Sequence, residues 1–201
     1  MSIGELATVV NSNFNKPINE QIRELAYSGS YLITGNRNFS PSKTGWYKII
    51  VVSSGGDAYE AKGRSGSSGG VAIATRRLDK NNTYTITKTG SEIAFDDIIC
   101  INAKNSTSSA YGAIGTASGG DMNYDGSFGT SSGGADIGVF IPQLMETTKN
   151  TYAYDSAYIM VESGLGILGY GGGQTIYNED IQVVSPNKGG CVLIIPLEFE
   201  E

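Results

Sequence analysis

The pattern of apolar and polar residues changes near position 29. Before it, Ile18, Ile22 and Leu25 follow one another at spacings of four and three residues, with polar residues between them. This period is typical of an amphipathic helix. Pro17 suits the first helical turn, and Gly29 suits the end of a helix. The pattern therefore predicts one short helix close to the N-terminus.

A helix of this length is not stable alone in water, so its apolar stripe must be buried. The stripe could pack on the rest of the chain, on other copies around a symmetry axis, or on another protein. We interpret residues 1–29 as an N-terminal attachment or oligomerisation segment. Residues 30–201 are interpreted as a glycine-rich β domain.

After position 29 the sequence reads as short strands. Runs rich in β-branched and aromatic residues alternate with Gly, Asn and Pro, which is the pattern of strands joined by turns. The predicted strands are 31–34, 47–52, 70–76, 83–88, 98–103, 137–141, 158–162, 181–184 and 191–199. The last is an almost continuous apolar run and should be central or buried on both faces, and 79–82 should form a turn. Many short strands favour an all-β fold, either a β-sandwich or a jelly roll.

A glycine-rich pattern occurs twice, 64 residues apart. Ser-Gly-Gly-Asp at 54–57 is followed by Ser-Gly-Gly at 68–70, and Ser-Gly-Gly-Asp at 118–121 by Ser-Gly-Gly at 132–134. Glycine has no Cβ, so it permits positive φ and close approach of two backbones. We therefore predict loops or extended strands that pack backbone against backbone. The structural glycines in this interpretation are Gly55, Gly56, Gly69, Gly70, Gly119, Gly120, Gly133, Gly134, Gly189 and Gly190.

Composition narrows the classes of function. A hydrophobic content of 39% is enough for a core, and no apolar run is long enough for a membrane span, so we expect no membrane insertion. The net charge is −6 and the one basic pair, Arg76-Arg77, suits a solvated strand end, so nucleic acid is not an expected partner. The N-terminus lacks a signal peptide, which predicts synthesis in the host cytoplasm. The chain has no histidine, which removes the commonest general base.

The two cysteines lie within apolar runs, Ile-Ile-Cys-Ile around Cys100 and Cys-Val-Leu-Ile-Ile from Cys191. Buried cysteines behave as small hydrophobic residues, which is the interpretation we favour. A disulfide and a catalytic thiol are the alternatives, although no cationic residue flanks either cysteine.

Asp121, Asn123 and Asp125, followed by Gly126, match the first half of a calcium-binding loop. The position that normally supplies a bidentate glutamate holds Ser132 instead. The same alternation also suits a strand followed by a turn. We therefore assign no metal and no cofactor, and keep these three residues as a weak calcium candidate.

Two other patterns point weakly to enzymes. The glycines of 164–171 resemble a phosphate-binding fingerprint, but strand-like and loop-like residues follow where that motif needs a helix. Paired carboxylates across a groove could hydrolyse glycosides, but the spacing fixes no pair. The available acids are Asp96, Asp97, Glu146, Asp155, Glu162, Glu179 and Asp180. We expect no catalytic residues.

Aromatic residues gather in or beside the predicted loops. They are Tyr111, Tyr124, Phe128, Tyr152, Tyr154 and Tyr170. Aromatic rings stack on sugars and offer stiff contact area, and loops on a rigid β scaffold commonly carry binding residues. These rings either cover the core or a subunit interface, or form an exposed receptor-binding surface.

Four landmarks resemble one known family. The run Gly-Trp-Tyr-Lys-Ile-Ile-Val-Val-Ser-Ser-Gly-Gly-Asp at 45–57 resembles the strand that opens the glycine-rich domain of bacteriophage tail-fibre and tail-tip proteins. Segments 68–87, 115–123 and 189–195 resemble later parts of that domain in the same order. The resemblance implies a jelly-roll-like β-sandwich with extended, polyglycine-II-like glycine segments. This chain has glycine pairs where the family has longer runs, which favours short glycine stretches.

The resemblance also implies a function. Such domains form homotrimers at the end of a phage tail fibre or tail tip, where they bind the host surface without catalysis. The expected partners are other copies, tail or baseplate proteins, and a bacterial surface glycan, wall polymer or protein, within a virion or a phage-tail-like bacteriocin. A purely structural tail or baseplate component is the alternative, and a polysaccharide depolymerase is a third.

Overall fold

The computed structural model describes residues 31–59, 64–129, 174–177, 181–184 and 189–200. These residues form strands and connecting segments, with no helix among them. The strands are β1 (Tyr31–Ile33), β2 (Arg37–Phe39), β3 (Gly45–Val52), β4 (Val71–Leu78), β5 (Tyr84–Lys88), β6 (Glu92–Phe95), β7 (Ile98–Ile101), β8 (Thr116–Ser118), β9 (Met122–Tyr124), β10 (Gln174–Tyr177), β11 (Ile181–Val184) and β12 (Cys191–Phe199). The predicted all-β class is confirmed for this part of the chain.

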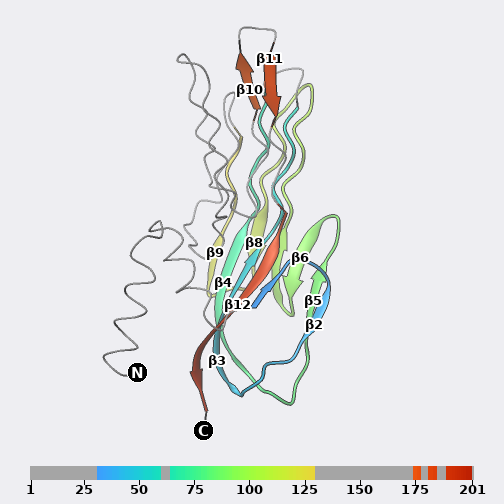
Figure 1. Cartoon of the computed structure of the whole chain (residues 1–201). Helices are drawn as coiled ribbons and strands as arrows, with labels where there is room; N and C mark the ends of the chain where they lie inside the picture. The colour runs from blue at the N-terminus through green and yellow to red at the C-terminus, as the bar shows by residue number, and fades with distance from the viewer. Residues whose placement is uncertain (1–30, 60–63, 130–173, 178–180, 185–188, 201) are drawn as a thin grey trace, which may run out of the picture.

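Two antiparallel five-stranded sheets form the lower half of the molecule in Figure 1. The first has the order β1-β12-β3-β4-β9 and the second the order β2-β5-β6-β7-β8. β10 and β11 form a separate antiparallel hairpin. The arrangement is consistent with a β-sandwich.

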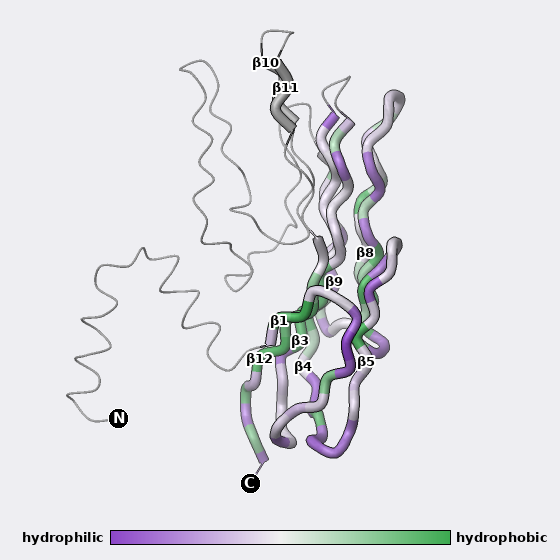
Figure 2. Tube along the Cα trace, turned by 45° about the vertical axis from the view of Figure 1, so that its right-hand side comes forward, coloured by the Kyte–Doolittle hydropathy of each residue, from purple (hydrophilic) through white to green (hydrophobic). Residues whose placement is uncertain are grey.

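The core lies between the two sheets because alternate residues of each strand point the same way. In β3, Tyr47, Ile49 and Val51 point inward and are almost fully buried. They pack with apolar residues of the second sheet, including Phe95 and Ile98. Figure 2 shows hydrophobic colour concentrated in β1, β3, β4 and β12.

The other face of the first sheet carries a second buried cluster. It consists of Ile50, Val52, Val71, Ile73, Cys191 and Leu193. Residues Cys191 to Ile194 of β12 therefore contribute to both clusters, and each is 0% exposed. β12 pairs with β1 on one side and β3 on the other. The prediction that this strand is central or buried on both faces is confirmed for its central place, and burial on both faces holds for Cys191 to Ile194, while the end of the strand is exposed.

All seven predicted strands that fall in the described part of the chain are present. β1, β3, β4, β5, β7, β11 and β12 correspond to predicted strands. The turn at 79–82 is also confirmed, because the Asn82 amide donates to the Asp79 carbonyl at 3.0 Å. β2, β6, β8, β9 and β10 were not predicted, since each has only three or four residues and no long apolar run. The predicted strands at 137–141 and 158–162 and the predicted N-terminal helix lie outside the described residues.

Five extended segments continue from the ends of the strands, and we call them the array. They are residues 53–59, 64–70, 102–106, 110–115 and 125–129. They run side by side above the sandwich in Figure 1, and they are pale in Figure 2 because glycine and serine have intermediate hydropathy. The array makes the described part of the molecule elongated.

Hydrogen bonds in the array recur every third residue. The first two segments keep the register of the β3–β4 hairpin. Their amide-to-carbonyl bonds run from Ser53 to Gly70 (3.0 Å), from Gly56 to Ser67 (2.8 Å) and from Tyr59 to Arg64 (2.8 Å). Antiparallel β ladders instead pair every second residue. A three-residue repeat is that of an extended helix with three residues per turn, whose residues face three directions.

The third direction brings in a segment that is distant in sequence. The amides of Ala103 and Ser106 donate to the carbonyls of Ser54 and Asp57, at 3.0 and 2.9 Å. The amides of Ser54 and Asp57 donate in turn to the side-chain oxygens of Asn102 and Asn105, at 3.0 and 2.9 Å. Both sets again advance by three residues. The array is thus a three-dimensional lattice of backbones and not a sheet.

Glycine makes this packing possible. A Cβ placed on Gly56 or Gly112 would come within 3.0 Å of the Lys104 carbonyl, closer than real Cβ atoms approach. The same holds for Gly69 against the Ser53 carbonyl and for Gly126 against Ser68. At these positions a neighbouring backbone occupies the space of a side chain. This contact is of the backbone-to-backbone kind that the sequence predicts for Gly56 and Gly69.

Buried serines tie the segments together. Ser53, Ser65, Ser67 and Ser68 are 0% exposed and Ser106 is 6% exposed. The Ser53 hydroxyl donates to the Ile101 carbonyl at 2.8 Å and accepts from the Gly70 amide at 2.8 Å. The Ser106 hydroxyl donates to the Ser65 carbonyl at 2.8 Å. Apart from the Ser65 hydroxyl, which has no hydrogen-bond partner among the described residues, these small hydroxyls satisfy backbone groups that no ladder reaches.

Replacing Gly69 by Ala is expected to lower the free energy of unfolding by about 1–3 kcal/mol, because the new methyl group overlaps the Ser53 carbonyl. Gly90→Ala is the matched control, since no atom lies within 4 Å of its Cβ position, and it should change stability by less than about 1 kcal/mol. Denaturant unfolding measures both. Equal effects of the two substitutions would contradict the close packing.

Candidate functional site

The three candidate aromatics within the described residues occupy two different environments. Phe128 is 60% exposed and Tyr111 is 38% exposed, and both belong to the array. Tyr124 is half-buried in β9 and packs against the second buried cluster. Tyr152, Tyr154 and Tyr170 lie outside the described residues. Of the described three, Phe128 and Tyr111 have the exposure that a binding surface needs.

One buried serine places Tyr111 and Phe128 at the same level of the array. The Ser67 hydroxyl donates to the Gly112 carbonyl at 2.6 Å and accepts from the Gly129 amide at 3.4 Å. Each aromatic residue directly precedes one of these two glycines. The rings therefore project from two segments that meet at Ser67, on backbones that glycine packing holds in place.

The loop that leads to Tyr111 is also held from the side. The Arg64 guanidinium donates to the carbonyls of Thr107, at 3.0 Å, and Ser108. The Thr107 hydroxyl accepts from the Ala110 amide at 3.2 Å, and the Thr107 amide donates to the Ala110 carbonyl at 2.8 Å. Four hydrogen bonds thus fix the polar turn that precedes the ring, so little ordering entropy would be lost on binding.

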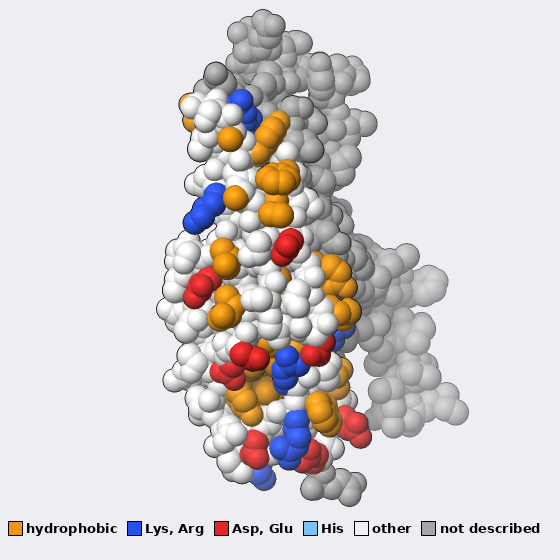
Figure 3. Space-filling view, turned by 180° about the vertical axis from the view of Figure 1, so that it is seen from behind, with side chains coloured by type: hydrophobic (Ala, Val, Ile, Leu, Met, Phe, Trp, Pro, Cys, Tyr) orange, Lys and Arg blue, Asp and Glu red, His pale blue; other side chains and the backbone are white. Residues whose placement is uncertain are grey.

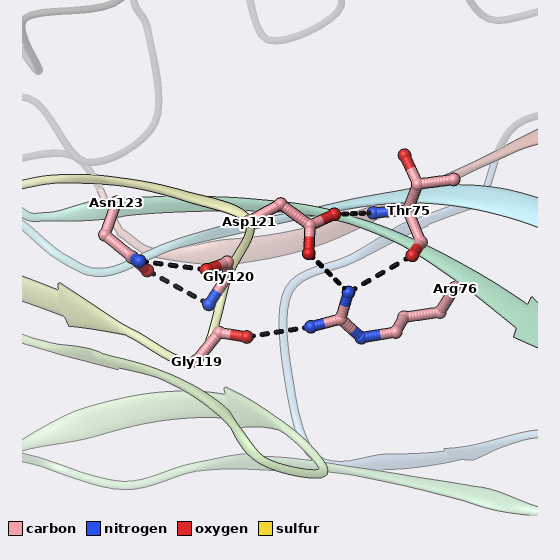
Figure 4. Close-up of polar contacts among 6 residues, drawn as sticks. All are labelled: Thr75, Arg76, Gly119, Gly120, Asp121 and Asn123. Carbon is pink, nitrogen blue, oxygen red and sulfur yellow. Dashed lines mark hydrogen bonds and ion pairs between the residues drawn. The ribbon is translucent and has the colours of Figure 1, made fainter.

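The second copy of the glycine motif forms a corner between the two sheets (Figure 4). It links β8, in one sheet, to β9, in the other. Gly119 has a φ of 79°, which favours glycine. The Arg76 guanidinium donates to the Gly119 carbonyl at 2.9 Å and to the Asp121 carboxylate at 2.7 Å. The other Asp121 oxygen accepts from the Thr75 amide at 2.7 Å.

This ion pair adds a role that the sequence does not predict. Arg76 lies near the end of β4 with its side chain 33% exposed, which agrees with the expected solvated strand end, and it also holds the corner to β4. Hydrogen bonds from Arg76 and from the Thr75 amide lower the pKa of Asp121 below its usual value. Gly119-Gly120-Asp121 is thus a structural clamp. The first copy, at 54–57, lies instead in the array, so the two copies have different conformations.

The oxygens of the weak calcium candidate have protein partners. Both Asp121 oxygens are bonded as above, and the Asn123 oxygen accepts from the Gly120 amide at 3.0 Å. One Asp125 oxygen accepts from the Ala117 amide at 3.1 Å. Within the described residues, no three or more His, Cys, Asp or Glu side chains are grouped so as to hold a metal. The observed contacts are those of the alternative interpretation, a strand followed by a turn.

Of the carboxylates considered for hydrolysis, Asp96 and Asp97 lie in the described part of the chain. They occupy the tight turn between β6 and β7, where Asp96 has a φ of 50° and its carboxylate accepts from the Thr85 amide at 3.2 Å. Both are exposed neighbours on one turn and do not face each other across a groove. The remaining acids and the glycine run 164–171 lie outside the described residues.

Both cysteines are free and fully buried, as the favoured interpretation predicted. Cys100 belongs to the core between the sheets, where its thiol donates to the Val51 carbonyl at 3.3 Å. Burial raises the pKa of Cys100 and of Cys191 to about 12. At neutral pH both groups are therefore protonated thiols without nucleophilic character.

Neither models of protein families nor curated proteins gave a match to this chain. No helix in the described residues has the length and apolar character required to cross a membrane. The site must therefore be understood from its own geometry. That geometry offers exposed aromatic rings on a rigid backbone lattice.

The buried thiols predict a loss of stability at alkaline pH. Unfolded thiols ionise near pH 9, whereas the buried ones keep their protons to about pH 12. The contribution of the buried thiols to the free energy of unfolding should be fully present below pH 9. Above pH 9 it should fall by about 1 kcal/mol per thiol for each pH unit. Unfolding titrations at pH 8 and 10 should show a smaller difference for the Cys100→Ala/Cys191→Ala variant. An equal difference, or rapid thiol labelling of the folded protein at pH 8, would contradict this assignment.

Proposed function

We propose that this protein is a bacteriophage tail-fibre or tail-tip protein that binds a host surface component without catalysis. Its counterpart in a prophage or a phage-tail-like bacteriocin would do the same. The observation that carries the proposal is the exposure of Tyr111 and Phe128 on two array segments that both bond to the Ser67 hydroxyl. Exposed rings on a stiff scaffold suit stacking against sugars. A bacterial surface glycan or wall polymer is the proposed ligand.

The fold supports the same proposal. We infer that the sandwich is jelly-roll-like and that the array is polyglycine-II-like, since its hydrogen bonds repeat every three residues. Both features belong to the glycine-rich domain that the sequence resembles. The array separates the aromatic surface from the apolar sandwich. An extended spacer of this kind suits a protein that reaches from a particle to a cell.

Assembly into a homotrimer completes the proposal, with residues 1–29 as the attachment segment. A single aromatic site on an open surface binds sugars weakly. Three linked sites make the second engagement intramolecular, which raises avidity by roughly 10²–10⁴. The protein would then act within a virion or a tail-like particle.

A structural role in the tail or baseplate is the second candidate. Trp46, Leu197 and Phe199 are 44%, 55% and 43% exposed, and all three lie at the lower end of the first sheet. Large exposed apolar side chains in one region are typical of subunit contacts. In this alternative the same fold joins other tail proteins and the aromatic residues of the array are buried in the particle.

Binding to host cells distinguishes the two functions. The Tyr111→Ala/Phe128→Ala variant should bind labelled cells at least about tenfold more weakly, because two stacking contacts are lost. Trp46→Ala is the control, an exposed aromatic at the other end of the sandwich. Binding that is unchanged by the double substitution, or reduced equally by the control, would reject the aromatic surface as the receptor site.

Light scattering tests the oligomeric state. The full chain should have the mass of a trimer, and a version lacking residues 1–29 should dissociate, because the apolar stripe of Ile18, Ile22 and Leu25 is removed. Circular dichroism of the shortened protein should keep its β signal. A monomeric full-length protein would remove the basis for avidity.

A further inference from the structure

A polar hollow lies at the end of the sandwich opposite to the array. It is formed where the chain enters β3, where it leaves β4, and where it follows β12, and its volume is about 440 Å³. Its lining residues include Lys43, Thr44, Arg77, Asp79, Lys80 and Glu200. Figure 3 shows charged side chains of both signs gathered over the lower part of the molecule, while the face above is mostly uncharged. The hollow is of the size that small ligands occupy.

The acidic residues of the hollow are already engaged. Both Glu200 oxygens accept from the Arg77 guanidinium, at 2.5 and 2.6 Å. This pair lowers the pKa of Glu200, so its carboxylate is charged at neutral pH. One Asp79 oxygen accepts from the Asn81 amide at 2.8 Å and from the Thr44 hydroxyl at 3.5 Å. The carboxylates thus hold the walls in place.

The lysines are the groups left for a ligand. Lys43 and Lys80 have no carboxylate partner among the described residues. The Lys43 ammonium lies 5.0 Å from the centre of the Phe199 ring, and that ring is 43% exposed. The lining carries three cations against two carboxylates. Hydroxyls of Ser42 and Thr44 and the second Asp79 oxygen add donors and acceptors suited to a polyhydroxy compound.

We propose that this hollow binds an acidic saccharide unit, one that bears a carboxylate or a phosphate. The two lysines would contact its anionic group, and Asp79 with the nearby hydroxyls would bind its hydroxyls. A neutral sugar would leave both ammonium groups without a partner. The site uses none of the array residues and lies at the other end of the β3–β4 hairpin. Ligand binding in the hollow therefore does not depend on the aromatic surface.

The test is calorimetry or NMR titration of the full chain with four probes. Methyl glucuronide and glucose 6-phosphate represent the two anionic sources, and methyl glucoside and inorganic phosphate are the neutral and non-saccharide controls. We expect one or both anionic probes to bind at least tenfold more tightly than either control. Which of the two binds identifies the carboxylate or the phosphate as the recognised group.

Variants locate the binding. Lys43→Ala/Lys80→Ala should weaken the anionic probe at least tenfold, and Lys43→Arg/Lys80→Arg should restore most of the binding. Lys104→Ala is the matched control, an exposed lysine in the array, and should have no effect. Thermal unfolding of each variant verifies the fold. No binding of either anionic probe, equal binding of the glucoside or of phosphate, or equal loss in the control would each overturn the proposal.

Cell binding separates this inference from the proposed function. If Tyr111→Ala/Phe128→Ala abolishes cell binding while the hollow binds no anionic probe, the receptor function stands and the second site does not. If the hollow binds its probe and the Tyr111→Ala/Phe128→Ala variant binds cells normally, the second site stands and the aromatic surface is rejected as the receptor site.

Discussion

The close approach of backbones at glycine is the constraint on which the upper half of this protein depends. At Gly56, Gly69 and Gly112 a neighbouring carbonyl occupies the space that any side chain would need. That contact sets the spacing between segments, which lets amides and serine hydroxyls reach carbonyls in three directions. The exposed rings of Tyr111 and Phe128 are held by the same network. The positions of these two rings therefore depend on the glycines and serines of the array.

The two halves of the molecule are stabilised differently. Burial of apolar side chains on both faces of β12 stabilises the sandwich. The array has little apolar surface to bury and relies on backbone and serine hydrogen bonds, each of which contributes only about 1 kcal/mol net. The sandwich supplies the apolar burial that the array lacks. Each array hairpin continues the register of a strand pair below it. The sandwich thus aligns the segments that then bond to one another.

The sequence was informative where one local signal decided the structure. The apolar runs of β3 and β12 were long enough to predict strands, and the paired glycines predicted close backbone packing. Strands of three residues, such as β8 and β9, carry no such signal, since pairing with distant partners forms them. Asp121 shows the same limit: its motif suggested calcium, whereas Arg76, 45 residues away, is its partner. The exposure of Phe128 and the burial of Ser67 likewise depend on neighbours that sequence spacing does not reveal.

The three-residue repeat has a consequence for how proteins of this design can change in length. An insertion of one or two residues in a single segment would turn its bonding faces away from their partners. Adding three residues to every segment restores all of them and extends the lattice by about 9 Å, at about 3.1 Å per residue. The reach of such a spacer can thus evolve only in discrete steps. The number of residues in corresponding segments of related chains would then differ by multiples of three.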